Sequence, residues 1–231
     1  MISIGGFQKL SLINYPGKMA ACVFLNGCIF RCRFCYNTEL ACPPYSRSLS
    51  VEDVLADLRK CHWALDGVVI SGGEPCMHPD LPEFIRPIKE MGYLIKLDTC
   101  GYFPDMLRIL LDLGFVDYIA MDIKAPFRKY DELVQVKVDD RRLRDSIQII
   151  LESGIEHEFR STLVSGAHAA EDLREMAAEI SGARAYYLQP FRANAPLMDP
   201  TYSTRIAPPM DEMLRAVKDS GSKIGSCEVR G

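Results

Sequence analysis

The stretch Cys28-Ile29-Phe30-Arg31-Cys32-Arg33-Phe34-Cys35 gives three cysteines the spacing C-x-x-x-C-x-x-C, directly after the apolar run Ala20 to Leu25. A four-iron cluster usually takes four thiolates, so a loop that offers three leaves one iron open to an exchangeable ligand. Gly27, just before the first cysteine, permits a sharp turn out of the apolar run. The spacing therefore predicts a reactive iron-sulfur site with three metal ligands, Cys28, Cys32 and Cys35.

Two other uses of this loop remain open at this point. With Cys42 as a fourth ligand it could form a structural zinc site, which typically has four protein ligands. The three cysteines could also be ordinary buried thiols. The six remaining cysteines form no second C-x-x-C pair, and the chain has an odd number, nine. We therefore expect reduced thiols and a single cluster.

A second motif, Ser71-Gly72-Gly73-Glu74-Pro75, follows the apolar run Val68-Val69-Ile70. Glycines allow a close approach of the backbone, and a carboxylate pairs with an ammonium group through charge-assisted hydrogen bonds. Alone, such a segment could be just a turn between a strand and a helix. Combined with the cysteine loop, it favours a turn that binds a ligand carrying an amino group.

Composition and charge narrow the class of protein. The chain has 231 residues and 48% hydrophobic residues, which suits one large core, and we expect a single domain over residues 1–231. The net charge is -4 and no cluster of lysine and arginine marks a nucleic-acid surface. The first residues lack the pattern of a signal peptide, and no apolar run approaches the roughly 18 residues of a membrane span. We expect a cytoplasmic protein with neither nucleic acid nor membrane as a partner.

Short apolar strands alternate with amphipathic helical stretches, the pattern of a parallel sheet with crossover helices. The expected strands are residues 20–25, 67–71, 94–98, 116–121, 156–163 and 185–189. The expected helices are residues 50–61, 82–92, 105–113, 139–153, 169–180 and 209–220, with irregular stretches at 42–48, 125–137 and 192–209. Six units are too few for a full eight-unit barrel. The pattern predicts an α/β fold, a partial (β/α)6 TIM-like barrel whose parallel sheet is open on one side.

Polar residues gather where the later strands end. They are Asp98 and Thr99, then Asp122 and Lys124, then Arg160, and finally Gln189 and Arg192. The carboxyl ends of parallel strands meet at one face, where function is usually placed. These side chains are therefore candidates for one binding pocket.

The cysteine loop, with Phe34 before its last cysteine, resembles that of the radical S-adenosylmethionine (SAM) enzymes. The resemblance implies a [4Fe-4S] cluster, with SAM cleaved reductively to a 5'-deoxyadenosyl radical. It further implies that Gly72, Gly73 and Glu74 bind the amino group of SAM. Phe34 and Tyr36 flank the third cysteine and join the cofactor-binding candidates.

The Asp-Thr-x-Gly and Asp-x-Lys segments resemble those of the glycyl-radical-enzyme activating enzymes. By this resemblance Lys124 approaches the carboxylate of SAM, and Asp98 and Asp122 lie near its ribose or methionine portion. A monovalent cation beside SAM is also implied, held by Asp98, Thr99 and Asp122. The partner would be a glycyl radical enzyme, and the electron donor reduced flavodoxin or ferredoxin.

Residues 6–18 resemble the start of activating proteins for anaerobic ribonucleoside-triphosphate reductase. Asn14 departs from an aspartate common there, and Tyr36 from a histidine. A pyruvate formate-lyase-like enzyme is a second partner class. Two other functions remain open: a small-molecule enzyme of the 7-carboxy-7-deazaguanine synthase kind, acting on a pterin, and a non-enzymatic electron carrier.

Overall fold

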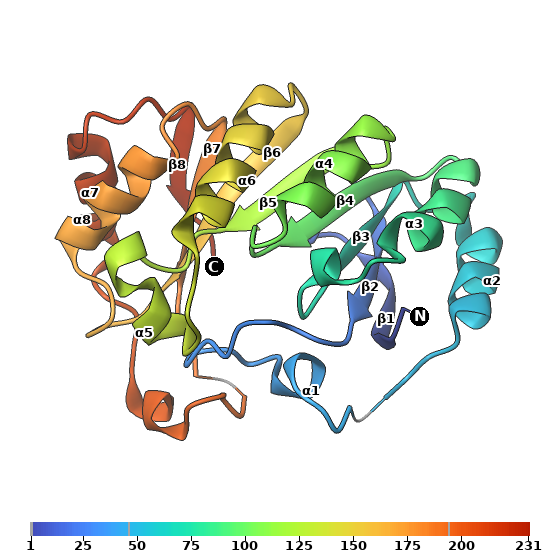
Figure 1. The fold of residues 1–231 in the computed structure, drawn as a ribbon, viewed down its shortest axis with the longest axis horizontal. Coiled ribbons are helices and arrows are strands. Elements are labelled where there is room, and N and C mark those ends of the chain that lie inside the picture. Colours follow the sequence, from blue (N-terminus) through green and yellow to red (C-terminus); the bar gives the residue numbers. More distant parts are fainter. Residues whose placement is uncertain (1, 46, 194) are drawn as a thin grey trace. The chain divides into compact units, whose positions relative to one another are not determined.

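The computed structural model describes residues 2–45, 47–193 and 195–231 (Figure 1). Met1, Ser46 and Asn194 lie outside the described residues, and the last two belong to stretches that were expected to be irregular. The chain divides into two compact units, one of residues 1–29 and 39–119, the other of residues 30–38 and 120–231. The expected single domain stays a prediction.

The first unit alternates strands and helices. Its strands follow chain order, β1 antiparallel to β2, and then β2, β3 and β4 parallel. Ala20 of β2 is level with Gly67 of β3, and Gly67 with Leu94 of β4. The elements are β1 (Ile4–Ser11), β2 (Ala20–Leu25), α2 (Val51–Cys61), β3 (Gly67–Gly72), α3 (Leu81–Glu90), β4 (Leu94–Thr99) and α4 (Pro104–Asp112), and α1 (Thr38–Ala41) begins at the division.

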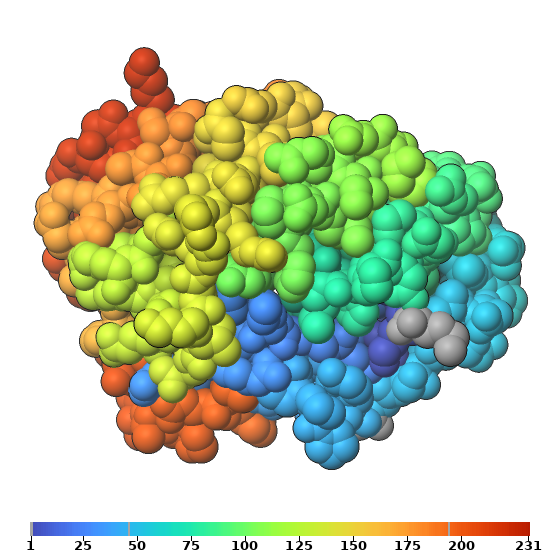
Figure 2. Space-filling view, in the orientation of Figure 1, coloured from blue at the N-terminus to red at the C-terminus, as the bar shows by residue number. Residues whose placement is uncertain are grey.

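Helix ends in this unit are encoded locally. Ser50 caps α2 by accepting a hydrogen bond from the backbone N–H of Asp53 at 3.2 Å. Gly92 ends α3 with φ +89°, a conformation that glycine adopts without steric cost. Helices α3 and α4 run along the outside of the strands (Figure 1), and in the space-filling view their side chains cover those strands (Figure 2).

The second unit repeats the pattern, with β6, β7 and β8 parallel in chain order. β5 (Tyr118–Asp122) crosses the division, and just after it the N–H of Ile123 donates to the carbonyl of Arg160 at 2.8 Å. The other elements are α5 (Tyr130–Val134), α6 (Asp140–Glu152), β6 (Glu156–Leu163), α7 (Ala170–Glu179), β7 (Ala185–Pro190), α8 (Met210–Asp219) and β8 (Ser226–Val229). Short 3-10 helices cover Pro75–Met77, Phe127–Lys129 and Pro200–Thr204.

The predicted parallel α/β pattern is confirmed. Two strands have the predicted bounds, Ala20–Leu25 and Glu156–Leu163. β5 begins at Tyr118 rather than at residue 116, because the side chain of Asp117 turns back to accept from the N–H of Ile95 at 2.7 Å. The prediction missed β1, β8, α1 and α5. Within the described residues, no helix is long and apolar enough to cross a membrane.

Candidate active site

The cysteine loop begins in the first unit, which includes Cys28 and Ile29. Gly27 takes φ +93°, and its N–H donates to the carbonyl of Leu40 at 2.7 Å. The N–H of Cys28 donates to the carbonyl of Ala41 at 3.3 Å. The backbone on this side of the loop is therefore pinned against α1, and the glycine is required for the turn.

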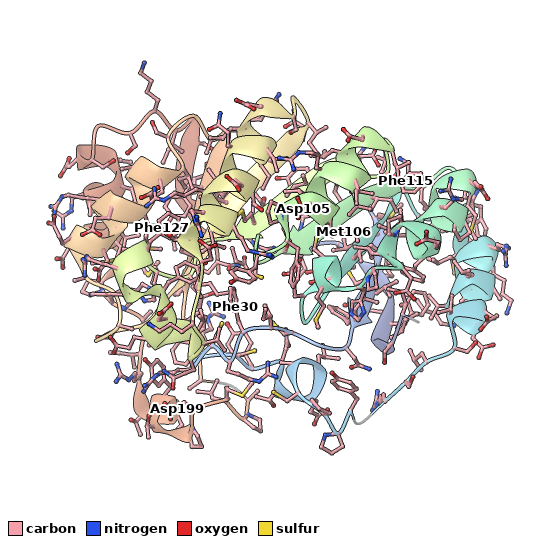
Figure 3. All side chains as sticks on the ribbon, viewed as in Figure 1. Phe30, Asp105, Met106, Phe115, Phe127 and Asp199 are labelled. Carbon is pink, nitrogen blue, oxygen red and sulfur yellow. The ribbon has the colours of Figure 1, made fainter. Side chains whose placement is uncertain are left out.

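The rest of the loop belongs to the second unit, where α5 holds it. The N–H groups of Arg31 and Arg33 donate to the carbonyls of Val134 and Leu133, at 2.9 and 3.1 Å. Phe30, labelled in Figure 3, meets the ring of Tyr130 edge to face at 6.0 Å. Backbone bonds and ring packing together fix the loop ahead of Cys32.

The far end of the loop is tied to the segment before the last 3-10 helix. The N–H of Met198 donates to the carbonyl of Cys35 at 3.0 Å, and Arg33 forms an ion pair with Asp199 at 3.3 Å. Asp199 is labelled in Figure 3. Within the loop, the N–H of Cys35 donates to the carbonyl of Cys32 at 3.0 Å. These bonds hold the two later cysteines on an ordered turn.

The chemistry of the loop suits an iron-sulfur cluster. None of the nine cysteines of the chain is in a disulfide, so their sulfur atoms are in the reduced state that metal binding requires. Cys32 is buried, whereas Cys28 and Cys35 are partly exposed. Across the residues that the structure describes, no group of three histidine, cysteine, aspartate or glutamate side chains is arranged around a single metal ion.

The Gly72-Gly73-Glu74 turn is clamped against the start of the cysteine loop. The N–H of Glu74 donates to the carbonyl of Gly27 at 2.8 Å, and that of Gly73 to the carbonyl of Leu25 at 2.9 Å. A Cβ atom on Gly73 would lie 2.0 Å from the carbonyl oxygen of Gly27, and one on Gly72 would lie 2.4 Å from the nitrogen of Leu25. Neither contact is possible, so both positions require glycine.

The side chain of Glu74 turns inward and is completely buried, with 0% exposed. Its Oε1 accepts from the N–H of Cys76 at 2.9 Å and from the hydroxyl of Thr99 at 2.8 Å. Its Oε2 accepts from the N–H of Cys100 at 2.6 Å. The carboxylate thus ties the turn after β3 to the turn after β4. The expected contact of this carboxylate with an amino group stays a prediction.

Asp98 lies at the end of β4, beside the same turn. Its Oδ2 accepts from the hydroxyl of Ser71 at 3.1 Å, and its Oδ1 pairs with the ammonium group of Lys96. Lys96 was missed from the sequence, and Ser71 was noted only as the first residue of the second motif. Because alternate residues of a strand share a face, a lysine two positions before an aspartate was the available signal.

In the second unit, Asp122, Lys124 and Arg160 come together as expected. Nε of Arg160 lies 2.9 Å from Oδ1 of Asp122, and Nζ of Lys124 lies 3.2 Å from Oδ2. Burial by itself would raise the pKa of Asp122, but the two cations outweigh it and lower the pKa to about 2. The carboxylate is therefore ionised at every physiological pH.

A second carboxylate supports this group and was missed from the sequence. Glu158 is completely buried and accepts twice from Nη1 of Arg230, at 3.0 Å to each oxygen. Nη1 of Arg160 lies 3.9 Å from it. The guanidinium of Arg230 lies 3.3 Å from the ring centroid of Tyr187. A charged chain thus runs from Arg230 through Glu158 and Arg160 to Asp122.

The remaining candidates also lie in the second unit. The ring of Tyr36, 43% exposed, stacks on Phe191 with centroids 6.4 Å apart. Phe34 is buried and therefore packs in the interior. Gln189 accepts a long hydrogen bond of 3.5 Å from Thr162. Arg192 is exposed just after β7.

Comparisons with known proteins identify the family of the chain. Residues 22–180 match the sequence profile described as the Radical SAM superfamily. The "Putative glycyl-radical enzyme activating enzyme MJ1227" of Methanocaldococcus jannaschii is 32% identical over 81% of this chain and 79% of its own length. The pyruvate formate-lyase-activating enzyme of Clostridium pasteurianum is 30% identical over 49% of this chain, which spans about half of that enzyme, 53%.

Solved structures share the fold. SuiB of Streptococcus suis bound to S-adenosylmethionine has a TM-score of 0.67 at 15% identity, covering 89% of this chain and 48% of that one. QueE from Escherichia coli has a TM-score of 0.58 at 15% identity, covering 97% of this chain and 93% of that one. The predicted fold class, the partial α/β barrel of radical SAM type, is confirmed.

Proposed function

Since the chain belongs to the radical SAM superfamily and to its branch of glycyl-radical enzyme activating enzymes, we propose that it generates a glycyl radical on a partner protein. Its cofactors are a [4Fe-4S] cluster and SAM. When bound, the reduced cluster would supply the one electron that breaks the S–C5' bond of SAM, giving methionine and a 5'-deoxyadenosyl radical. In the proposed reaction this radical removes a hydrogen atom from a glycine Cα of the partner.

The observation that carries the proposal is the clamp between the two motifs. Gly73 is pressed so closely on Gly27 that no side chain fits between them. The turn proposed to bind SAM is therefore held against the loop proposed to bind the cluster, next to Cys28. Such fixed placement is what proximity and orientation in catalysis require.

Each group of residues has a proposed role. Cys28, Cys32 and Cys35 bind three irons, and the backbone carbonyls of Gly72 and Gly73 accept from the amino group of SAM. Glu74 positions that turn from inside the unit. From the second unit, Lys124 and Arg160 bind the carboxylate of SAM, and Tyr36 offers a ring face. Phe34, Gln189 and Arg192 remain candidates for SAM contacts.

The partner class is part of the proposal. It is a glycyl radical enzyme, either an anaerobic ribonucleoside-triphosphate reductase or a pyruvate formate-lyase-like enzyme. Reduced flavodoxin or ferredoxin is the proposed electron donor. A cytoplasmic location follows from this chemistry, because free thiols and a reducible cluster need a reducing compartment.

The test is anaerobic reconstitution with iron and sulfide, reduction with dithionite, and measurement of 5'-deoxyadenosine formed from SAM. We expect Cys32→Ala to abolish the product and Cys42→Ala, a cysteine outside the loop, to leave it within about twofold. Loss of iron and activity in both variants would contradict the assigned ligand set.

A second measurement tests the partner. Incubation with either partner enzyme should give the electron paramagnetic resonance doublet of a glycyl radical. A pterin turned over without any partner protein would instead favour the 7-carboxy-7-deazaguanine synthase kind, to which the chain is also similar: the Halobacterium salinarum enzyme is 32% identical over 43% of this chain.

A further inference from the structure

The inner face of β4 carries a buried lysine that the proposed function leaves without a role. Lys96 is only 1% exposed and lies level with Val69 of the neighbouring strand β3. Its ammonium group contacts the carboxylate of Asp98, two residues further along the same face. Lysines are almost never fully buried unless they are paired, so the two side chains form one ionic unit.

The surroundings hold this pair in place. The ammonium nitrogen of Lys96 lies 5.8 Å from the ring centroid of Tyr118, which adds a cation–π attraction. Asp98 receives its second bond from the hydroxyl of Ser71 at 3.1 Å. Both carboxylate oxygens of Asp98 therefore have a donor from the same unit.

The residues expected to hold a monovalent cation are bonded to protein donors in the same way. The hydroxyl of Thr99 donates to Glu74 at 2.8 Å, so it is directed toward the buried carboxylate. Asp122, in the other unit, is paired with Lys124 and Arg160. A bound cation would offset the negative charge of Asp98 and Asp122, but both of these carboxylates already have a protein cation beside them. The residues do not fit the expected ion.

We propose that Lys96 is the built-in counter-ion of Asp98, and that this chain binds and cleaves SAM without a monovalent cation. The proposal rests on the proposed function, because it assigns Asp98 to the SAM-binding region. The ammonium group extends from the middle of a strand and stays in place whatever salt is present. A diffusible ion would leave when its concentration falls.

The first experiment measures SAM cleavage by the reconstituted enzyme in two buffers. One contains potassium as its only monovalent cation, and the other contains tetramethylammonium, an organic cation that is bulkier than a metal ion. We expect the rates of the natural enzyme to agree within about twofold. For Lys96→Met we expect the rate in tetramethylammonium to fall by about tenfold, roughly the effect of one lost charge pair, and potassium to restore part of it.

The second experiment measures binding of rubidium, as a potassium substitute, by equilibrium dialysis in the presence of SAM. We expect no uptake above background by the natural enzyme and about one equivalent by Lys96→Met. This measurement does not depend on SAM cleavage. If the protein forms no 5'-deoxyadenosine, the proposed function is wrong, but rubidium binding still shows whether the protein has a site for a monovalent cation.

Controls separate the outcomes. Lys89→Met removes a lysine that pairs with Asp117 at 2.8 Å near the opposite ends of the strands, and should create no cation requirement. Lys96→Arg keeps the charge and should behave like the natural enzyme. The proposal is overturned if the natural enzyme takes up rubidium and slows more than about tenfold in tetramethylammonium, a result that holds even if Lys96→Met does not fold.

Discussion

Glu74 of the first unit and Asp122 of the second are both carboxylates at strand ends, but they are satisfied in different ways. Glu74 is fully buried and accepts from two backbone N–H groups and one hydroxyl. Asp122 has 32% of its side chain exposed and is bonded by two long cationic side chains. The first arrangement fixes the backbone, and the second keeps ionic groups close to solvent.

The difference indicates what each group can do for a ligand. Glu74 is fully buried and three of the about four acceptor sites of its carboxylate are occupied by protein donors, so we propose that it acts as a positioning residue. Lys124 and Arg160 have further N–H donors beyond those given to Asp122, since an ammonium has three and a guanidinium five. The second unit therefore offers direct ionic contacts, whereas the first offers a rigid backbone.

The largest effect is expected from Glu74→Ala. It leaves the N–H groups of Cys76 and Cys100 and the hydroxyl of Thr99 without their acceptor, and such buried donors cost about 1–3 kcal/mol each. We expect the free energy of unfolding to fall by about 3 kcal/mol or more. Chemical denaturation under anaerobic conditions, followed by circular dichroism, measures the change.

Two companion variants sharpen this prediction. Glu83→Ala removes an exposed carboxylate from α3 and should change stability by no more than about 0.5 kcal/mol. Glu74→Gln keeps the shape but sets an NH2 group against a donor, so its loss should be intermediate. If Glu74→Ala is as stable as the natural protein and only binds SAM less well, the carboxylate is a ligand after all and the contrast with Asp122 disappears.

Asp122→Asn should act on affinity rather than on folding. Without the negative charge, Lys124 and Arg160 lose the group that orients them, and we expect the KM for SAM to rise about tenfold with a smaller change in kcat. Asp131→Asn is the matched control, because its partner Lys137 is 98% exposed and the pair is screened by solvent. A loss of kcat without a change in KM would show that the group serves the reaction step instead.

The same contrast shows what the sequence could predict. Buried strands such as β2 and β3 have continuous apolar runs, and the first and last residues of these strands were predicted to within one or two residues. β1 was missed because Gly5 and Gly6 interrupt it and Lys9 is charged, and β8 because it has only four residues with a glutamate among them. Edge strands such as these lack an apolar signal.

Within the site, residue types were predictable but their partners were not. The Asp122, Lys124 and Arg160 group follows from the convergence of strand ends. The inward turn of Glu74 depends on backbone donors that come from Cys76 and from Cys100 after a different strand. Such a contact is set by tertiary packing, and no spacing in the sequence encodes it.

A smaller effect is expected from Arg230→Ala, at the far end of the charged chain. Removing it takes the bidentate partner from buried Glu158, but Arg230 is itself 38% exposed, which weakens the pair. We expect a loss of about 1 kcal/mol in stability and a modest rise in the KM for SAM, both relieved in the double variant with Glu158→Gln. If the effects of Arg230→Ala and Glu158→Gln are simply additive in the double variant, these charged side chains do not act together to orient Arg160.

The smallest effect concerns pH. Because Arg160 and Lys124 lower the pKa of Asp122 to about 2, its contribution to stability is present above the unfolded value of about 3.9 and is lost only as pH falls through about 2. Burial also lowers the pKa of His168, whose ring contacts the carbonyl of Lys124 at 2.9 Å, so the imidazole stays neutral down to a pH below its ordinary titration range. The affinity for SAM should therefore vary less than about twofold between pH 7 and 9 from these groups. A fall in SAM affinity toward the acid end of that range that is absent in Asp122→Asn would mean that the two cations do not hold this carboxylate ionised. The contrast drawn between Asp122 and Glu74 would then be wrong.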